Sequence, residues 1–399
     1  MAGRDLEVDL GDLSFGEGAH LLVDRALRRA SAARSIVRVR GTGASWRLDL
    51  DAWARAHGHS VTHESEAAIV VATPHGSGVA TERAGLARAT DPGAVHDAPP
   101  LRWGLAARGA QVEANAPEIP FLLASKRMVW ADEAARLYAQ AVAQQWDPAI
   151  AIPWNDPTEL PDEVEDAVVS VMTYLVENET AALLVPARFL SQIHPHFREV
   201  MQLLAITAAD EARHVEVFAR RASLRRGGEI GRSTASGQRS LSTLLIEPDF
   251  ATASFLLSVL GEGTFLDLLW FLRDHAPDPV TAEVVRLAAQ DEARHVAFGL
   301  AHLSRHASED SGLHARLAAA VERRHANLGD EGGLDPGVLD ALVLLAAGSW
   351  EHDAIRRGHA AVVELVRRMD DGRQQRLRRL GFDATEAETL SSLHTRNFM

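Results

Sequence analysis

The stretch DEARHVEVF, at Asp210–Phe218, is followed 81 positions later by DEARHVAFG, at Asp291–Gly299. The first six letters are identical in the two copies, and the chain is otherwise not repetitive. Both copies lie in sequence with the apolar spacing of long helices. A charged six-residue motif that recurs within two such helices is the feature from which fold and function can be predicted.

Each repeat places a Glu and a His three positions apart, Glu211 with His214 and Glu292 with His295. Residues i and i+3 of an α-helix project from the same side, so each pair can bind one ion. Apolar residues share that face in both helices, and both pairs are therefore expected to point into the core. Burying a carboxylate and an imidazole is costly unless they are paired or bind metal.

A four-helix bundle that holds two metals in this way takes one further carboxylate from each of the two other core helices. Glu262 shares an apolar helix face and lies 30 positions before Glu292. Before the first repeat, Glu177 and Glu179 lie on opposite sides of one helix, and Glu179 has the more apolar neighbours. Glu179 is therefore preferred, 32 positions before Glu211.

Four carboxylates and two imidazoles make up the predicted ligand set. Its members are Glu179, Glu211, His214, Glu262, Glu292 and His295. Four negative charges balance two divalent cations, and oxygen with imidazole suits iron or manganese better than softer metals. The alternative is a charged helix stretch that recurs without binding metal, its histidines satisfied in the core. Two copies on apolar faces, each with an upstream Glu, favour the metal site.

Composition excludes several classes of function. The 399 residues suffice for two or three domains, and the absence of cysteine removes disulfides, thiolate nucleophiles and iron–sulfur clusters. A net charge of −14 argues against nucleic acid as a partner, because phosphate binding needs clustered positive charge. The longest apolar run, at 341–347, is too short for a bilayer, and the acidic start MAGRDLEVDLGDL is unlike a secretory signal. We expect a soluble, cytoplasmic protein that contacts no membrane.

The chain changes character twice. Residues 1–75 read as helix, strand, helix and strand, with the alternating run SIVRVR at 35–40 and the β-branched run AAIVVA at 67–72, which predicts a small α/β domain of βαβ type. Residues 76–118 are rich in Gly, Ala, Pro and Asp and are expected to form a linker or loops. Residues 119–399 are expected to be all helical.

The predicted fold class is mostly α: a four-helix bundle with additional C-terminal helices, preceded by the small α/β domain. Helices are expected at 121–145, 162–193, 197–226, 248–275, 278–307, 308–328 and 336–380, the last of them interrupted.

The N-terminal run SIVRVRGTGASWRLDLDAWARAHGHSV resembles small sulfur-carrier domains of the SirA/TusA type. Those domains carry a Cys-Pro-x-Pro motif that opens the first helix. The matching place here is FGEGA at 15–19, without cysteine. The resemblance therefore implies a scaffold or docking role, with sulfur transfer lost.

The paired motif resembles the ferritin-like di-iron carboxylate superfamily, in its large oxygenase branch of ribonucleotide-reductase-like and bacterial monooxygenase-like proteins. The likeness covers residues 121–306 and implies a ferritin-like four-helix bundle. Asp210 and Asp291 match the aspartates that in this superfamily accept a hydrogen bond from a ligand histidine and orient its ring. Arg213 and Arg294 are expected to neutralise these aspartates.

The resemblance implies an O2-activating non-haem enzyme with two Fe ions, or Mn/Fe, that hydroxylates, N-oxygenates, desaturates or cleaves a small organic molecule. A radical-storing reductase subunit is disfavoured, because those proteins have a Tyr where this chain has Phe218. The substrate pocket is expected near Thr207, Phe218, Thr264 and Phe265. The alternatives are a ferroxidase or peroxide-scavenging protein of rubrerythrin type, and a structural or adaptor protein that binds metal.

The expected partners follow from this function. They are O2, a small-molecule substrate and an external electron donor, since the chain has neither a flavin fingerprint nor iron–sulfur cysteines. A homodimer is compatible with the sequence, which does not determine the oligomeric state.

Overall fold

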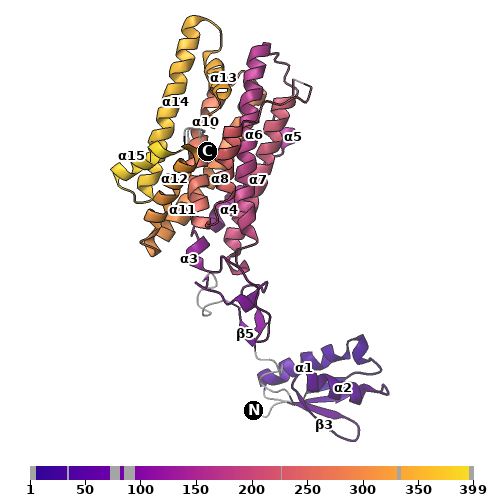
Figure 1. Ribbon diagram of the computed structural model, residues 1–399. Helices are drawn as coiled ribbons and strands as arrows, with labels where there is room; N and C mark the ends of the chain where they lie inside the picture. The colour runs from indigo at the N-terminus through magenta and orange to yellow at the C-terminus, as the bar shows by residue number, and fades with distance from the viewer. Residues whose placement is uncertain are drawn as a thin grey trace. The chain divides into compact units, whose positions relative to one another are not determined.

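The chain forms two compact units in a computed structural model that describes residues 6–33, 36–71, 81–84, 95–225, 227–329 and 334–394. One unit comprises Met1–Ala84 and Ala110–Pro117, and the other comprises Gly85–Gly109 and Glu118–Met399 (Figure 1). Of the predicted linker at 76–118, residues 76–80 and 85–94 lie outside the described residues. The described remainder is divided between the two units.

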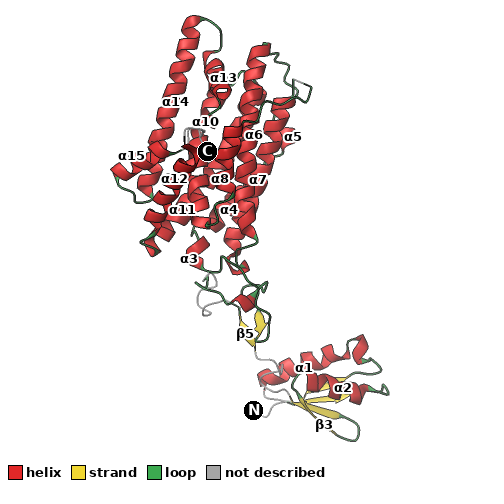
Figure 2. Ribbon diagram, in the orientation of Figure 1, coloured by secondary structure: helices red, strands yellow, loops and turns green. Residues whose placement is uncertain are grey.

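A four-stranded sheet with two helices makes up most of the N-terminal unit. The elements are β1 (Leu6–Asp9), a 3-10 turn (Phe15–Glu17), α1 (Ala19–Ala33), β2 (Val37–Arg40), α2 (Trp46–Ala56), β3 (Ser60–His63) and β4 (Ala68–Val71). The strand order is β1-β2-β4-β3, with β1 parallel to β2 and the other pairs antiparallel. Both helices lie on one side of the strands (Figure 2). A separate two-stranded sheet joins β5 (Thr81–Arg83) to β6 (Gln111–Glu113).

The alternation of apolar and polar residues decides which strands could be predicted from the sequence. Val37 and Val39 of β2 are fully buried against the helices, as the alternating pattern predicts. Strands β1 and β3 were not predicted, since their sequences LEVD and SVTH are short and show no run of buried apolar residues. The resemblance to sulfur-carrier domains stays a prediction.

The larger unit is helical. Its elements before the bundle are a 3-10 turn (Leu101–Trp103), α3 (Lys126–Val129), α4 (Ala134–Ala143) and α5 (Pro148–Ala151). The four core helices are α6 (Asp162–Leu190), α7 (Arg198–Ser223, after a 3-10 turn at Pro195–Phe197), the continuous run of α9 (Phe250–Ser254), a π-helix (Phe255–Glu262) and α10 (Gly263–Asp274), and α11 (Pro279–Glu309). The remaining helices are α8 (Ala235–Leu245), α12 (Leu313–Leu328), α13 (Pro336–Ala347), α14 (His352–Arg379) and α15 (Ala384–Leu393).

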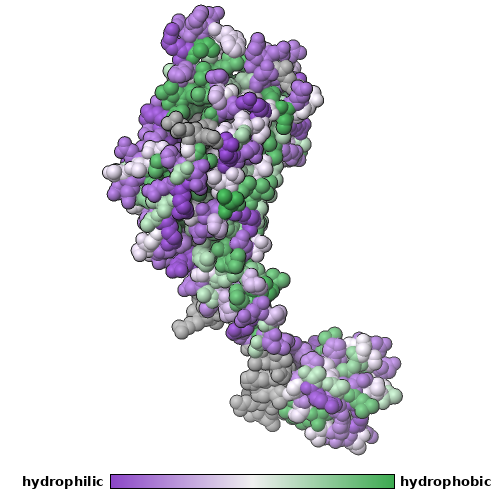
Figure 3. Space-filling view, in the orientation of Figure 1, coloured by the Kyte–Doolittle hydropathy of each residue, from purple (hydrophilic) through white to green (hydrophobic). Residues whose placement is uncertain are grey.

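Helices α6 and α7 pack side by side, and α10 packs on α11 (Figure 1). The predicted fold class is confirmed: the protein is mostly α, with long core helices, additional C-terminal helices and an N-terminal α/β region. Helix α6 and the run Phe250–Asp274 are long and apolar enough to cross a membrane, yet 61% and 78% of their most apolar windows are buried inside the protein. Apolar residues lie in small groups among hydrophilic ones on the face shown in Figure 3.

Two predicted helices differ from the structure, and the interruption expected in a third is present. The helix expected at 121–145 is interrupted: residue Leu123 forms a β-bridge with Ile193, and only α3 and α4 are helical. The interruption predicted within 336–380 occurs between α13 and α14, where Gly348 takes a φ of 66° and ends α13. The helix expected at 308–328 begins only at Leu313, because α11 continues to Glu309.

Besides the four-residue α5, two longer helices were not predicted. Helix α8 has the Ser- and Thr-rich sequence ASGQRSLSTLL, whose intrinsic helix propensity is low, and it forms where Thr234 caps it and Leu244 is buried. Helix α15 begins with a capping box between Asp383 and Glu386. In α8, tertiary burial overrides the local preference.

A buried ion cluster ties three core helices together at one end of the bundle. The Arg221 side chain of α7 is 1% exposed and donates to both oxygens of Glu165 on α6, at 2.7 and 3.0 Å. It also donates to Asp278 at 2.6 Å and to Thr281 at 2.8 Å, at the start of α11. Asp278 additionally caps α11 by accepting from the Thr281 amide.

We predict that Arg221→Ala lowers the free energy of unfolding by about 3–5 kcal/mol, because it leaves two buried carboxylates without a cation. Glu216→Ala, an exposed position on the same helix, serves as control and should change this free energy by no more than about 0.5 kcal/mol. Urea denaturation followed by circular dichroism measures both. Equal stability of the two variants would contradict the prediction.

Candidate metal centre

Four helices bring the six predicted ligands together. Helix α7 supplies Glu211 and His214, α11 supplies Glu292 and His295, α6 supplies Glu179, and the last residue of the π-helix supplies Glu262. All six residues are between 0% and 3% exposed. Glu177, the alternative to Glu179, faces away from them, where it accepts a hydrogen bond from Gln238. The repeated i, i+3 spacing therefore does place each Glu beside its His.

The six residues form two overlapping groups, each with ligand atoms that all lie within 4.8 Å of one another. One group contains Glu179, Glu211, His214 and Glu292, and the other contains Glu211, Glu262, Glu292 and His295. Glu211 and Glu292, one from each repeat, belong to both groups. Each group thus has one terminal carboxylate, one imidazole and two shared carboxylates, which is a donor set for a pair of ions.

The ligand atoms lack hydrogen-bond partners within the protein. This holds for both oxygens of all four glutamates and for Nδ1 of both histidines. His295 Nδ1 lies 2.8 Å from Glu211 Oε1, and His214 Nδ1 lies 3.3 Å from Glu211 Oε2, but neither contact has hydrogen-bond geometry. Buried polar atoms without partners cost free energy. Metal ions would satisfy these lone pairs, so the residues present fit a two-metal centre.

Burial also makes the charges of the cluster costly in the absence of cations. Burial raises the pKa of the Glu179 carboxyl to about 8, and the charge of Glu211 adds to the rise. Burial and the charge of Glu292 raise the pKa of Glu262 well above its usual range. Mutual repulsion of carboxylates in a dry site has this effect unless protons or metal ions neutralise them.

Both ligand histidines are oriented from behind by an aspartate of the opposite repeat. His214 Nε2 lies 3.1 Å from Asp291 Oδ2, and His295 Nε2 lies 3.5 Å from Asp210 Oδ2. A hydrogen bond at Nε2 leaves the lone pair on Nδ1, the atom that faces the glutamates. One aspartate thus lies behind each histidine, and the pairing crosses between α7 and α11.

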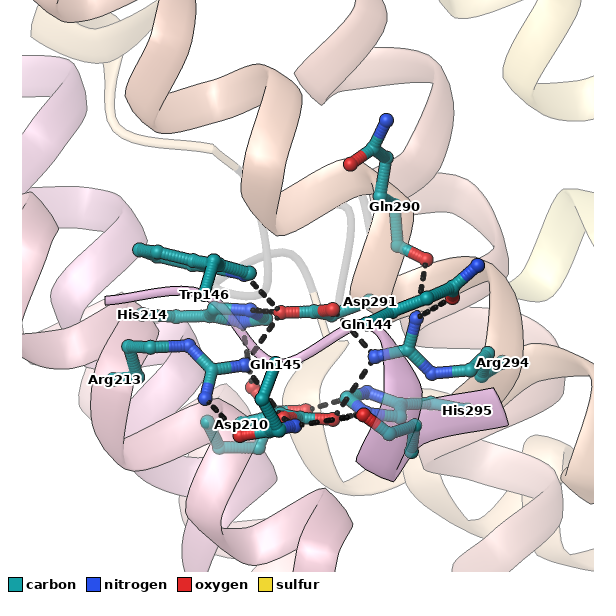
Figure 4. A network of polar contacts seen from close by, with 12 residues as sticks. Gln144, Gln145, Trp146, Asp210, Arg213, His214, Gln290, Asp291, Arg294 and His295 are labelled. Atoms are coloured by element: carbon teal, nitrogen blue, oxygen red, sulfur yellow. Dashed lines mark hydrogen bonds and ion pairs between the residues drawn. The ribbon is translucent and has the colours of Figure 1, made fainter. Parts of the chain in front are cut away.

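Two arginines neutralise these aspartates jointly (Figure 4). Arg213 donates to Asp210 at 2.6 Å and to Asp291 at 2.8 Å, and Arg294 likewise contacts both. Burial alone would raise the pKa of Asp210, but the hydrogen bond and charge of His295 lower it to about 2. Both aspartates are therefore held ionised, as acceptors for the histidines.

Three residues that follow α4 complete this network, and sequence reasoning missed their role. Gln145 donates to Asp210 at 2.8 Å, and Gln144 accepts from Arg294 at 2.8 Å. The Trp146 indole donates to Asp291 at 2.9 Å and stacks on the His214 ring, with centroids 6.4 Å apart and an interplanar angle of 12° (Figure 4). No spacing along the chain relates this segment to the repeats, so only its tertiary placement identifies it.

The π-helix is the second feature that the sequence did not reveal. Residues Phe255–Glu262 were expected to continue an α-helix, but they have i to i+5 geometry and end at the ligand Glu262. Short π-helical insertions are rare and frequently occur at functional sites. Because its hydrogen bonds span five residues instead of four, the π-helix changes the direction in which Glu262 projects relative to a regular α-helix.

A small cavity of about 20 Å³ adjoins one group of ligands. Glu262 and His295 line it together with mostly apolar side chains, among them Phe250 and Phe298. A cavity of this size holds about one water molecule. Of the four residues predicted near a substrate pocket, only Thr207 lines this cavity.

The other three predicted pocket residues lie elsewhere. Phe218 packs near His214, Phe265 packs near Tyr174, and Thr264 faces arginines of α14. A larger open groove, of about 780 Å³, runs along another face of α11 between Arg136 and Arg305 and contains none of the six ligands.

Comparison with known proteins finds similar solved structures only. No protein-family model matches the chain, and no curated protein matches it. Among solved structures, an R2-like ligand-binding oxidase with an aerobically reconstituted Mn/Fe cofactor is 20% identical over 67% of this chain and 94% of that one, with a TM-score of 0.43. An R2-like ligand-binding oxidase with a metal cofactor after photoconversion is 18% identical over 67% and 95% of the two chains, with a TM-score of 0.42.

We predict that the protein binds two Mn²⁺ ions per chain. Single substitutions should affect one ion or both, depending on the residue that is replaced. Glu179→Ala and Glu262→Ala should each retain one tightly bound ion, because each removes a ligand of one group only. Glu211→Ala and Glu292→Ala should weaken both ions by about 100-fold or more, since these residues are shared. Isothermal titration calorimetry and metal analysis after gel filtration measure stoichiometry and affinity.

Glu177→Ala is the matched control for this series, two positions from Glu179 on the same helix. It should retain both ions, because Glu177 faces away from the cluster. Binding of two ions by Glu211→Ala and Glu292→Ala at wild-type affinity would show that the assignment of shared ligands is wrong.

Proposed function

We propose that this protein is an O2-activating oxidoreductase whose helical unit holds two redox-active ions, iron with iron or manganese with iron. Glu179, Glu211, His214, Glu262, Glu292 and His295 would be their ligands. The bound pair would supply electrons to O2, and the oxidised molecule would be a small organic compound. The protein would work in the cytoplasm, without nucleic acid or membrane as a partner.

One observation carries this proposal. Buried carboxylate oxygens and imidazole nitrogens from four helices face one another without hydrogen-bond partners. Carboxylate oxygen and imidazole are ligands that suit iron and manganese, whereas the absence of cysteine leaves no thiolate for softer ions. The aspartate and arginine network orients the histidines before any ion binds. A purely structural ion would not require two such sites with shared carboxylates.

The chain's own residues would hold the reacting molecules in a dry environment. The cavity beside Glu262 and His295 would let a small molecule approach these two ligands. Its apolar side chains, which include Phe250, Leu257 and Phe298, favour an uncharged reactant such as O2. The hydrogen bonds from His214 and His295 to the aspartates keep both rings in one tautomer throughout.

Electrons beyond those of the substrate would come from an external donor. A partly exposed indole, Trp146, is hydrogen bonded to Asp291, which is hydrogen bonded to His214. This connection leads from the edge of the bundle to a ligand of the centre. The opposite histidine, His295, has Gln145 in the equivalent place behind Asp210 and thus no aromatic group there. Trp146 is therefore our proposed point of electron entry.

We predict that Trp146→Phe slows multiple-turnover O2 consumption with an external reductant by roughly 10–100-fold, because the hydrogen bond to Asp291 is lost. Binding of two metal ions should persist. Trp154→Phe is the control: its indole donates to the Pro148 carbonyl at 2.7 Å, away from the aspartates. Oxygen-electrode rates for both variants, with metal content measured in parallel, test this. Equal rates for the two variants would refute electron entry at Trp146.

A second function is favoured by the size of the cavity. Ligand pockets for organic molecules usually have volumes of about 300–1,000 Å³, whereas the cavity at the ligands has about 20 Å³. A ferroxidase or peroxide-scavenging protein needs no more room than that. The oxygenase proposal therefore requires that side chains such as Phe250 and Phe298 move when a substrate binds.

Anaerobic loading with two equivalents of Fe²⁺, followed by exposure to O2, distinguishes these functions. For the oxidoreductase we expect rapid O2 consumption with an optical transient, and an organic substrate should change the decay of that transient. Consumption of Fe²⁺ or peroxide that is insensitive to every organic compound would indicate the ferroxidase or scavenging function. Absence of O2 consumption in the loaded protein would refute both and leave a structural or adaptor role.

The N-terminal unit is proposed to be a docking module. Its sheet and helices contain no cysteine, so it cannot carry sulfur as a thiol.

A further inference from the structure

The π-helix that ends at Glu262 is held by a helix outside the four-helix core. Arg376 of α14 donates from Nε to the carbonyl oxygen of Val259, at 2.7 Å. The next carbonyl, that of Leu260, accepts from the Thr264 hydroxyl at 2.6 Å. Side chains thus bond to two successive carbonyls just before the ligand.

The two contacts belong to one network. The Thr264 hydroxyl has a single hydrogen, which it donates to Leu260, and its lone pairs remain free to accept. They accept from Arg376 at 3.3 Å and from Arg373, one turn earlier on α14, at 3.4 Å. Arg376 therefore contacts the π-helical backbone directly and a second time through Thr264.

Two glycines allow this close packing. A Cβ at Gly263, the residue after Glu262, would overlap the guanidinium group of Arg376. On the other side of the segment, a Cβ at Gly299 of α11 would lie only 2.7 Å from the Ser258 Cβ. The π-helix is thus enclosed between α11, which carries His295, and α14, which carries Arg376.

Burying the guanidinium groups of Arg373 and Arg376 lowers the free energy of unfolding, so stability alone does not explain their presence. Burial lowers the pKa of Arg376 to about 10, and the charge of Asp267 compensates only in part. Burial also lowers the pKa of Arg373. An apolar side chain of similar volume would pack there at lower cost. What the planar guanidinium offers in return is several hydrogen bonds in a fixed geometry.

We propose that Arg376 is a positioning residue of the metal centre, which makes the C-terminal helix α14 part of the apparatus that aims Glu262. By binding the Val259 carbonyl and Thr264, it keeps the π-helix in the conformation that projects Glu262 beside His295. This inference rests on the proposed function in one respect: it assumes that the group of Glu262 and His295 binds a metal ion. Glu179 and His214 lie on α6 and α7, whereas the hydrogen bonds of Arg376 go to Val259 and Thr264. The ion of that group should therefore keep its affinity without Arg376.

The test compares Arg376→Lys with Arg378→Lys. Lysine keeps the positive charge but not the planar fork that reaches two acceptors. Arg378 is exposed on the same helix, and its Nε donates to its own helix at the Gln374 carbonyl. Gly263→Ala provides a second, independent disruption, because it displaces the guanidinium from the opposite side.

Two measurements apply to each variant. In metal-free protein, hydrogen exchange of peptides covering residues 255–264 should be about tenfold faster in Arg376→Lys and Gly263→Ala than in wild type or Arg378→Lys. In Mn²⁺ titrations, one of the two ions should bind about 10–100-fold more weakly in those two variants, and the other should be unchanged.

Unchanged exchange at 255–264 in Arg376→Lys would overturn the proposal, and so would equal weakening of both ions, which would mean general destabilisation. Failure of the wild-type protein to bind a pair of ions would instead refute the proposed function. The exchange measurement on metal-free protein would still decide whether Arg376 holds the segment.

Discussion

The cost of burying four carboxylates and two imidazoles in an apolar bundle is the constraint on which the rest of the structure depends. Each of these groups is at most 3% exposed, and the atoms that face one another have no hydrogen-bond partners in the protein. Such a cluster persists only if cations or protons neutralise it. Glu211 and Glu292 belong to both groups, so the six residues form one continuous cluster.

The surrounding residues can be understood as a response to that constraint. Asp210 and Asp291 each accept a hydrogen bond from Nε2 of a histidine in the opposite repeat. Arg213 and Arg294 each contact both aspartates and neutralise their charges. Because the pairing crosses between α7 and α11, the two repeats are locked in register. The same network that fixes the imidazole tautomers therefore also fixes how the helices pack.

The symmetry of the repeats is broken in two places, and both bear on the proposed function. Trp146 lies behind His214, whereas Gln145 takes the equivalent place behind His295. Glu179 projects from a regular α-helix, whereas Glu262 ends a π-helix that packs against α14 and borders the cavity. Under the proposed function, electrons would enter near His214 and small molecules would approach near Glu262.

The sequence by itself determined the helical bundle and brought six distant residues into one hypothesis, because the i, i+3 spacing and the apolar faces are local properties that survive folding unchanged. It located Glu179 and Glu262 because a buried acid stands out on an apolar face. Only the tertiary structure decided the crossed hydrogen bonds, the place of Gln144, Gln145 and Trp146, the π-helix and the contact of Arg376 with Val259. Those features depend on which surfaces of separate helices meet, and no periodicity along a single helix encodes that meeting.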